Sequence, residues 1–269
     1  RVNTLKDKRA DVQKELAKSA IKTVATPYSP WGLRLADKSQ LGKLDAFTRG
    51  AIEVQDEGSQ LLALLVDAKR GEMVVDFCAG AGGKTLALGA SMRNTGRLYA
   101  FDTSAHRLAA LKPRLARSGL SNVHPVAIAH ERDDRIKRLA GKIDRVLVDA
   151  PCSGLGTLRR NPDLKWRHNP KAIEELTAKQ TAILQSAARL LKPGGRLVYA
   201  TCSILRQENE AIAEAFSAAN KDFTLLEAAP LLTHIGVENA DKLCRGPYLR
   251  LWPYQHHTDG FFAAVWQKL

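Results

Sequence analysis

Hydrophobic and polar positions follow two different periods along this chain. Short apolar runs that suit buried strands alternate with stretches in which apolar residues recur every three or four positions, as in amphipathic helices. Strands are predicted over residues 73–78, 97–102, 124–129, 145–150, 196–202, 224–229 and 261–268, and helices over 53–68, 84–92, 104–119, 169–191 and 206–219. This alternation predicts an α/β fold with a mixed, mostly parallel seven-stranded sheet covered by helices on both faces.

The first fifty residues follow a different pattern. Residues 1–22 indicate a short strand and then a helix, and residues 26–50 are rich in turn formers and read as a connector. We therefore expect a small α+β subdomain over 1–50 and a main domain over 51–269. The chain opens without Met on a charged, amphipathic segment, so we expect the subdomain to be truncated.

The net charge indicates a polyanionic partner. The 269 residues carry a net charge of +13, and residues 1–50 hold 11 Lys/Arg against 5 Asp/Glu. A surplus of this size in an otherwise globular chain favours nucleic acid. No apolar stretch is long enough for a membrane span, and the four cysteines lack zinc-site spacing, so we expect neither a membrane nor a metal. Reduced thiols suit a cytoplasmic protein, which we expect to be a monomer.

A second basic segment contains a tryptophan. The string GTLRRNPDLKWRHNPK covers residues 156–171. Cations that bind phosphates, with an aromatic side chain among them, suit single-stranded RNA, whose bases can stack on the ring. The predicted RNA-binding residues are Arg159, Arg160, Lys165, Trp166 and Arg167.

A glycine-rich turn after the first main-domain strand is a candidate cofactor site. In DFCAGAGGKT (76–85), Gly80, Gly82 and Gly83 allow a tight turn and a close approach to a ligand. The P-loop pattern requires a glycine where Cys78 stands, which disfavours ATP. Asp102 ends the next strand, where a carboxylate can bind ribose hydroxyls of NAD or S-adenosylmethionine, and the glycine pattern favours the latter.

Two cysteines follow neighbouring predicted strands. Cys152 lies in DAPCSG and Cys202 in ATCS, and the carboxyl ends of adjacent parallel strands would bring both thiols to one edge. A thiolate that adds to carbon 6 of cytosine turns carbon 5 into a nucleophile able to accept a methyl group. Asp149, in the same DAPCSG string, could assist at ring nitrogen 3 by hydrogen bonding or proton donation.

These strings resemble the RNA cytosine-5 methyltransferases of the Sun/Fmu type, which include a bacterial small-subunit ribosomal RNA enzyme. The matching strings are RVNTLK, QDEGSQL, DFCAGAGGKT, DAPCSGLGTLRRNPDLKWR, LKPGGRLVYATCS and DGFF, from residue 1 to 262. The resemblance implies a Rossmann-like class I methyltransferase fold with S-adenosylmethionine as cofactor. It implies that an RNA-binding subdomain ends within residues 1–50.

The resemblance also implies roles for single residues. Cys202 would be the nucleophile, Cys152 would assist product release, and Asp149 would contact the cytosine. The implied cofactor-binding residues are Cys78, Ala79, Gly80, Ala81, Gly82, Gly83, Lys84, Asp102, Asp133 and Asp149. Asp133 lies in Arg132-Asp133-Asp134-Arg135, which departs from the family's Gly-Asp-Ala-Arg-like string at the glycine. Asp134 and Glu131 are therefore alternatives for the contact with adenine.

Three other functions remain open at this point. In a DNA cytosine-5 methyltransferase the thiol of Pro151-Cys152 would attack, and Cys202 would be incidental. The same chemistry could act on transfer RNA instead of ribosomal RNA. A non-catalytic RNA-binding assembly factor could also keep this fold. ATCS and the basic N-terminal segment argue against the DNA enzyme, and the presence of every predicted catalytic group argues against the assembly factor. The stretch RRNPDLKWR favours ribosomal over transfer RNA only by resemblance.

Overall fold

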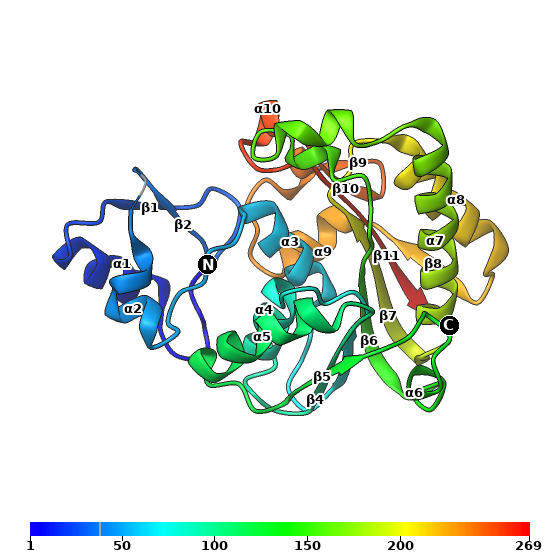
Figure 1. Ribbon diagram of the computed structural model, residues 1–269, viewed down its shortest axis with the longest axis horizontal. Helices are drawn as coiled ribbons and strands as arrows, with labels where there is room; N and C mark the ends of the chain where they lie inside the picture. Colours follow the sequence, from blue (N-terminus) through cyan, green and yellow to red (C-terminus); the bar gives the residue numbers. More distant parts are fainter. Residues whose placement is uncertain (38) are drawn as a thin grey trace.

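The predicted strands lie side by side in one sheet of a computed structural model, which describes residues 1–37 and 39–269. Along the sheet the order is β5-β4-β3-β6-β7-β11-β10-β9, and β8 also pairs with β11. The strands are β3 (Met73–Asp76), β4 (Arg97–Asp102), β5 (Val123–Ala127), β6 (Ile143–Asp149), β7 (Leu191–Thr201), β8 (Phe223–Leu226), β9 (Cys244–Arg245), β10 (Tyr248–Leu251) and β11 (Phe261–Lys268). Figure 1 shows this sheet running through the main body of the molecule.

The connections create a switch point in the middle of the sheet. Strands β3 to β7 are parallel, and β11 runs antiparallel beside β7. The chain passes from β3 to β4 and β5 on one side, and then from β6 to β7 on the other side of β3. Ligands of such sheets bind at the carboxyl ends of the strands next to this reversal.

The fold class is confirmed, but the number of strands differs from the prediction. The sheet has nine strands, where the sequence predicted seven. The two additional strands, β9 and β10, contain two and four residues. Segments this short carry little periodic signal. Strand β10 forms because it pairs antiparallel with β11, from Leu249 opposite Ala263 to Leu251 opposite Phe261.

Helices cover both faces of the sheet. On one face α3 packs against α4, α9 and β7, and on the other α7 packs against α8, β6 and β7. The main-domain helices are α3 (Glu57–Val66), α4 (Gly83–Ser91), α5 (Ala105–Ser118), α6 (Asp134–Lys137), α7 (Pro170–Ala188), α8 (Glu210–Ala219), α9 (Ala228–His234) and α10 (Pro253–His256). The short 3₁₀ turns are η2 (Leu155–Thr157), η3 (Pro162–Trp166), η4 (Arg206–Glu208) and η5 (Ala240–Leu243).

Alternation along β7 shows why the strands read as continuous apolar runs. Val198 and Ala200 belong to the hydrophobic core on the α3 face, whereas Leu197 and Tyr199 belong to the core on the α7 face. Successive side chains of a strand point to opposite faces, so a strand covered on both sides must be apolar at every position. These cores hold the carboxyl ends of β3, β4, β6 and β7 in place.

The N-terminal residues form a small lobe with a core of its own. It contains α1 (Arg9–Lys18), the hairpin of β1 (Thr23–Ala25) and β2 (Leu33–Leu35), η1 (Leu41–Lys43) and α2 (Asp45–Thr48). The expectation of a plain connector over 26–50 was therefore wrong, because β2, η1 and α2 lie within it. A β-bridge joins Val2 to Ile52, and both side chains belong to the small core.

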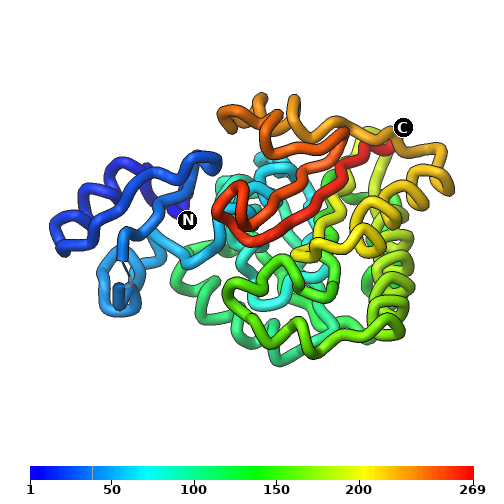
Figure 2. Tube along the Cα trace, turned by 90° about the horizontal axis from the view of Figure 1, so that it is seen from above, coloured from blue at the N-terminus to red at the C-terminus, as the bar shows by residue number. Residues whose placement is uncertain are grey.

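Figure 2 shows this lobe at one end of the molecule and the C-terminal strand running back through the main body. Within residues 1–37 and 39–269, no helix is both long and apolar enough to cross a membrane.

Candidate active site

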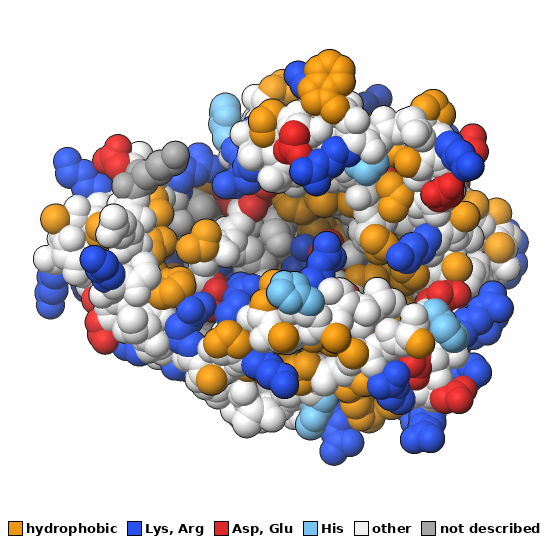
Figure 3. Space-filling model, viewed as in Figure 1, with side chains coloured by type: hydrophobic (Ala, Val, Ile, Leu, Met, Phe, Trp, Pro, Cys, Tyr) orange, Lys and Arg blue, Asp and Glu red, His pale blue; other side chains and the backbone are white. Residues whose placement is uncertain are grey.

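A cavity of about 980 Å³ opens at the carboxyl ends of β3, β4, β6 and β7. Its walls include all of the glycine-rich turn except Gly82 and Thr85, together with Asp102, Asp149, Cys152 and Cys202. Figure 3 shows a hollow on this face with Lys and Arg side chains gathered around its rim. The structure therefore brings most of the predicted cofactor and catalytic residues to one place.

The glycine-rich turn has the backbone that its glycines allow. Gly80 and Gly82 have φ of +54° and +83°, values that favour glycine. A Cβ on Gly80 would meet open space, whereas one on Gly82 would lie 2.1 Å from Leu111 Cδ1. Gly80 thus leaves room for a ligand, and Gly82 permits α5 to pack closely against the turn that begins α4.

Asp102 is held in position by backbone amides. Its two carboxylate oxygens accept hydrogen bonds from the N–H of Gly80 at 2.8 Å and of Ser104 at 2.7 Å. The side chain is nearly buried and lines the cavity. Each oxygen keeps a second lone pair, which could accept a hydrogen bond from a ribose hydroxyl.

Asp76 was not among the predicted site residues, yet it has an unusual environment in the cavity wall. Its Oδ2 accepts a hydrogen bond from Thr85 Oγ1 at 2.7 Å, while the buried Oδ1 has no hydrogen-bond partner. Burial raises the pKa of this carboxyl to about 7, and the charges of Asp149 and Asp102 add to the rise. A carboxyl at the end of β3, with an unused acceptor, could receive a cationic ligand group.

The two cysteine sulfurs are in contact. Cys152 Sγ and Cys202 Sγ lie 3.4 Å apart, because β6 and β7 are adjacent and Asp149 is paired with Ala200. The hydrogen bond with Cys202 and burial raise the pKa of the Cys152 thiol, and the nearby Glu208 raises it further. The hydrogen bond from Cys152 lowers the pKa of Cys202 against burial and Asp149, and Lys84 also lowers it. Cys202 therefore loses its proton first.

Lys84 connects the glycine-rich turn to the DAPCSG loop. Its Nζ donates a hydrogen bond to Asp149 Oδ2 at 2.7 Å. Burial lowers the pKa of Lys84, but the charge and hydrogen bond of Asp149, together with Asp76 and Cys202, outweigh burial, so the net pKa is raised and the side chain stays cationic. An ion pair thus lies between the cofactor turn and the base of the cysteine loops.

Asp133, like Gly82, is a predicted cofactor residue that does not line the cavity. It caps α6, and its oxygens accept hydrogen bonds from the N–H of Ala129 and from Arg135. The alternative, Glu131, does line the cavity, as does its neighbour His130.

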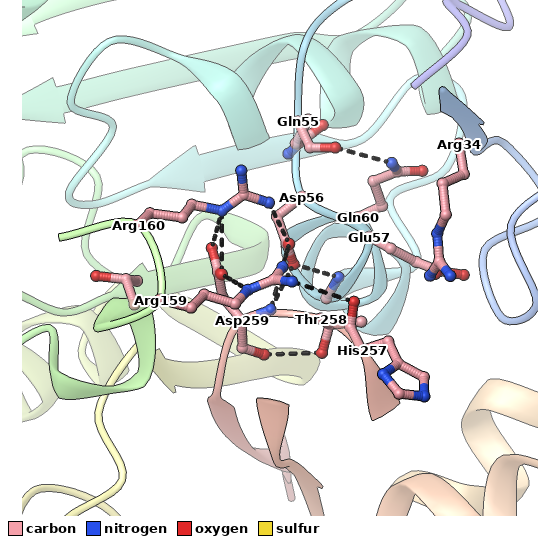
Figure 4. A network of polar contacts seen from close by, with 12 residues as sticks. Arg34, Gln55, Asp56, Glu57, Gln60, Arg159, Arg160, His257, Thr258 and Asp259 are labelled. Carbon is pink, nitrogen blue, oxygen red and sulfur yellow. Dashed lines mark hydrogen bonds and ion pairs between the residues drawn. The ribbon is translucent and has the colours of Figure 1, made fainter. Parts of the chain in front are cut away.

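The predicted RNA-binding residues fall into two groups. Arg159 and Arg160 both form ion pairs with Asp56, the N-cap of α3, and with Asp259, which precedes β11 (Figure 4). Arg159 Nη2 lies 2.7 Å from Asp56 Oδ2, and Arg160 Nε lies 2.9 Å from Asp259 Oδ2. These two arginines tie three distant segments together, so their charges are largely compensated.

The second group is exposed. Trp166 is 81% exposed and has Lys165 Nζ 5.0 Å from its ring centroid. Arg167 forms an ion pair with Asp163 at the surface. A ring with one free face beside two cations remains available for stacking on a base.

Comparison with known proteins shows the family of this chain. The family model for 16S rRNA methyltransferase RsmB/F matches residues 63–267, which is most of the chain. The chain belongs to this family. The resemblance seen in the sequence motifs is thereby confirmed, and the matched segment contains the glycine-rich turn and both cysteine loops.

Individual relatives agree with this assignment to the RsmB/F family. The chain is 36% identical over 269 residues to the probable ribosomal RNA small subunit methyltransferase B of Synechocystis, covering all of this chain and 59% of that protein. The solved structure of PH0851 is 37% identical, with a TM-score of 0.90, and covers all of this chain and 58% of that one. A methyltransferase homolog protein from Pyrococcus horikoshii is 33% identical, with a TM-score of 0.83, over all of this chain and 85% of that one. The chain spans about three fifths of the length of the curated relatives it matches.

The residues in the cavity fit the cofactor of an RsmB/F methyltransferase. S-adenosylmethionine carries ribose hydroxyls, an ammonium group and a sulfonium group. Asp102 can accept the hydroxyls, the unpartnered Oδ1 of Asp76 can accept a cation, and Gly80 leaves open space beside them. The cofactor predicted from the sequence is therefore confirmed at the level of the family and is compatible with this chain's residues.

Proposed function

We propose that this protein transfers a methyl group from S-adenosylmethionine to carbon 5 of a cytosine in RNA, through a covalent adduct on Cys202. The observation that carries the proposal is the pair of sulfurs 3.4 Å apart in the wall of the cofactor cavity. Two thiols in contact beside a methyl donor suit a reaction that forms and later breaks a carbon–sulfur bond.

Cys202 is the better nucleophile of the two. Its surroundings include the cationic Lys84, whereas Cys152 lies near the carboxylate of Glu208. An adjacent cation stabilises a thiolate, and an adjacent anion disfavours one. In the pair, Cys152 therefore donates its S–H to the thiolate of Cys202, which is ready to attack.

The ion pair of Lys84 and Asp149 can assist the attack. As the sulfur of Cys202 bonds to carbon 6 of cytosine, electron density moves to ring nitrogen 3, which takes up a proton. Asp149, held in place by Lys84 at 2.7 Å, can take up a proton from solvent, pass it to this nitrogen and hold the base. S-adenosylmethionine, when bound, supplies the methyl group that the activated carbon 5 takes up.

Product release requires that the bond between Cys202 and carbon 6 of the base be broken. The proton on carbon 5 leaves to water, its electron pair restores the ring double bond, and the bond between carbon 6 and Cys202 breaks. Ring nitrogen 3 returns its proton to Asp149. The departing sulfur must accept negative charge, and the S–H of Cys152 at 3.4 Å can stabilise it by hydrogen bonding. This geometry supports the division of labour in which Cys202 attacks and Cys152 assists release.

Ribosomal RNA is the proposed substrate. The net charge of +13 and the exposed Trp166 beside Lys165 favour a single-stranded nucleic acid. The family and the curated relatives are named for 16S or small-subunit ribosomal RNA, which favours it over transfer RNA. A ribosomal RNA substrate and a mechanism that needs reduced thiols both suit a cytoplasmic location, which we propose for this protein.

Single substitutions of the cysteines test the proposal. With labelled S-adenosylmethionine and 16S RNA, Cys202→Ala should abolish both methyl transfer and adduct formation. Cys152→Ala should accumulate a protein–RNA adduct that survives denaturing gels. Cys244→Ala is the matched control, because this cysteine lies outside the cavity wall in β9. An adduct formed by Cys202→Ala but not by Cys152→Ala would assign the attack to the other thiol. If the protein methylates transfer RNA and not 16S RNA, the proposal of ribosomal RNA as substrate is wrong.

A further inference from the structure

A buried glutamate next to the ATCS loop has no role in the mechanism so far. Glu208 ends η4, and it is fully buried. It is not among the residues that line the cavity, so it does not meet a ligand there. Among the described residues, no Lys, Arg or His forms an ion pair with it. A buried carboxylate without a cation is costly unless hydrogen bonds satisfy it.

Neutral donors from three elements satisfy this carboxylate. Oε1 accepts hydrogen bonds from the N–H of Ser153 and from Gln180 Nε2, each at 2.9 Å. Oε2 accepts hydrogen bonds from the hydroxyls of Ser153 and Ser203. Gln180 lies on α7 and also donates to the carbonyl of Pro151 at 3.0 Å, which fixes its amide orientation.

The two serines are the immediate neighbours of the two thiols. Ser153 follows Cys152, and Ser203 follows Cys202, so one carboxylate oxygen receives a hydroxyl from each cysteine loop. The hydroxyls are themselves 3.1 Å apart. The β6–β7 strand pairing reaches only to Asp149 and Ala200, so beyond it the loops depend on other contacts.

We propose that Glu208 is a positioning residue that joins the two cysteine loops through its carboxylate and thereby keeps the sulfurs of Cys152 and Cys202 in contact. Among the described residues, the loops are also connected by the contact between the two serine hydroxyls and by two backbone hydrogen bonds, from Ala150 to Ala200 and from Gly156 to Cys202. Its consequence for catalysis rests on the proposed function, whereas the positioning itself does not. The negative charge of Glu208 also raises the pKa of Cys152, which keeps that thiol as the hydrogen-bond donor.

Cross-linking of the thiols measures the positioning without any methyl transfer. Dibromobimane loses two bromides to two thiols and becomes fluorescent only when both have reacted. In the wild-type protein it should join Cys152 to Cys202, as peptide mass spectrometry can verify. Glu208→Ala should slow the second alkylation by about tenfold or more, because hydrogen bonds to a charged acceptor are lost. Glu208→Gln should recover part of the rate. Its amide oxygen can still accept a hydrogen bond from the Ser153 N–H, and the serine hydroxyls can rotate to accept hydrogen bonds from its amide NH₂ group.

Glu210→Gln is the matched control. Glu210 is two residues further along and bonds Arg250 instead of the cysteine loops, so cross-linking should stay at the wild-type rate. Ser203→Ala is a second variant, which removes one loop from the carboxylate without altering Glu208 itself. Ser203→Ala should also slow cross-linking, and it keeps the proposal testable if Glu208→Ala does not fold.

Activity separates this proposal from the proposed function. In Glu208→Ala, kcat for RNA methylation should fall, while KM for RNA and the Kd of S-adenosylhomocysteine stay within about twofold, because Glu208 does not line the cavity. A wild-type protein that cross-links but does not methylate RNA would refute the function and leave the positioning intact. Equal cross-linking rates in wild type, Glu208→Ala and Ser203→Ala would refute the positioning, as would a wild-type protein whose thiols do not cross-link.

Discussion

Replacing Asp76 by asparagine should make the protein more stable at alkaline pH and weaken its cofactor binding. The carboxyl is 1% exposed, and burial raises its pKa from 3.8 to about 7. In the unfolded chain the same group is an ordinary aspartate. Between these two values the folded protein therefore binds a proton that the unfolded chain has released, and stability falls as the pH rises through this range.

The size of the effect follows from the two pKa values. The difference between about 7 and 3.8 corresponds to about 4 kcal/mol of stability, present below pH 3.8 and lost by the time the pH has passed 7. Asparagine cannot ionise, and the hydroxyl of Thr85 can rotate to accept its N–H. Asp76→Asn should therefore lie within about 1 kcal/mol of wild type near pH 4 and exceed it by several kcal/mol at pH 8.

Urea unfolding of both proteins between pH 4 and pH 8 measures this difference. Other groups titrate equally in both chains, so their contributions cancel. Asp163→Asn is the control, because it removes an aspartate that is paired with Arg167 at the surface and is not buried in the cavity wall. If the difference between wild type and Asp76→Asn stays constant across the pH range, Asp76 does not carry the buried proton. Calorimetry with S-adenosylhomocysteine should show weaker binding to Asp76→Asn, because Asp76 would lose its charge toward a cationic group.

Two further predictions concern the same wall of the cavity. Lys84→Met should shift alkylation of Cys202 by iodoacetamide to higher pH, because the cation that lowers the pKa of Cys202 is removed and Asp149 is left unpaired. Peptide mass spectrometry measures alkylation of Cys202 at each pH, and the same pH profile in both proteins would contradict this prediction. Gly82→Ala should cost about 2–3 kcal/mol or more in urea unfolding, because the left-handed φ and the overlap with Leu111 add together. Gly71→Ala has a similar φ but open space, and it should lose only about 1 kcal/mol.

Much of the fold followed from local patterns. The strand over 97–102 and the helix that ends before Gly119 occur as predicted, because their apolar periods and caps are encoded within a few residues. The hairpin strand β10 and the elements within 26–50 were not predicted. Their short segments become strands or helices only through partners distant in the sequence, such as β11 for β10.

The candidate site divides in a similar way. The motifs DFCAGAGGKT, DAPCSG and ATCS identified the residues of the cofactor turn and both thiols, because spacing relative to predicted strands indicates which sheet edge a residue reaches. Spacing could not tell that Arg159 and Arg160 are paired with Asp56 and Asp259, or that Asp133 caps α6 outside the cavity. The arginine pairings depend on side chains that approach across about a hundred positions in the sequence.

The chemical groups of the site follow from residue types alone: a glycine turn, an acid at the end of β4, two thiols and a surplus of basic residues. The folded arrangement sets their electrostatic environments. It placed Lys84 beside Cys202, and it buried the carboxyls of Glu208 and Asp76. The reason is physical: a side chain's type is a local property, whereas its pKa and hydrogen bonds depend on the burial and charges that distant segments supply.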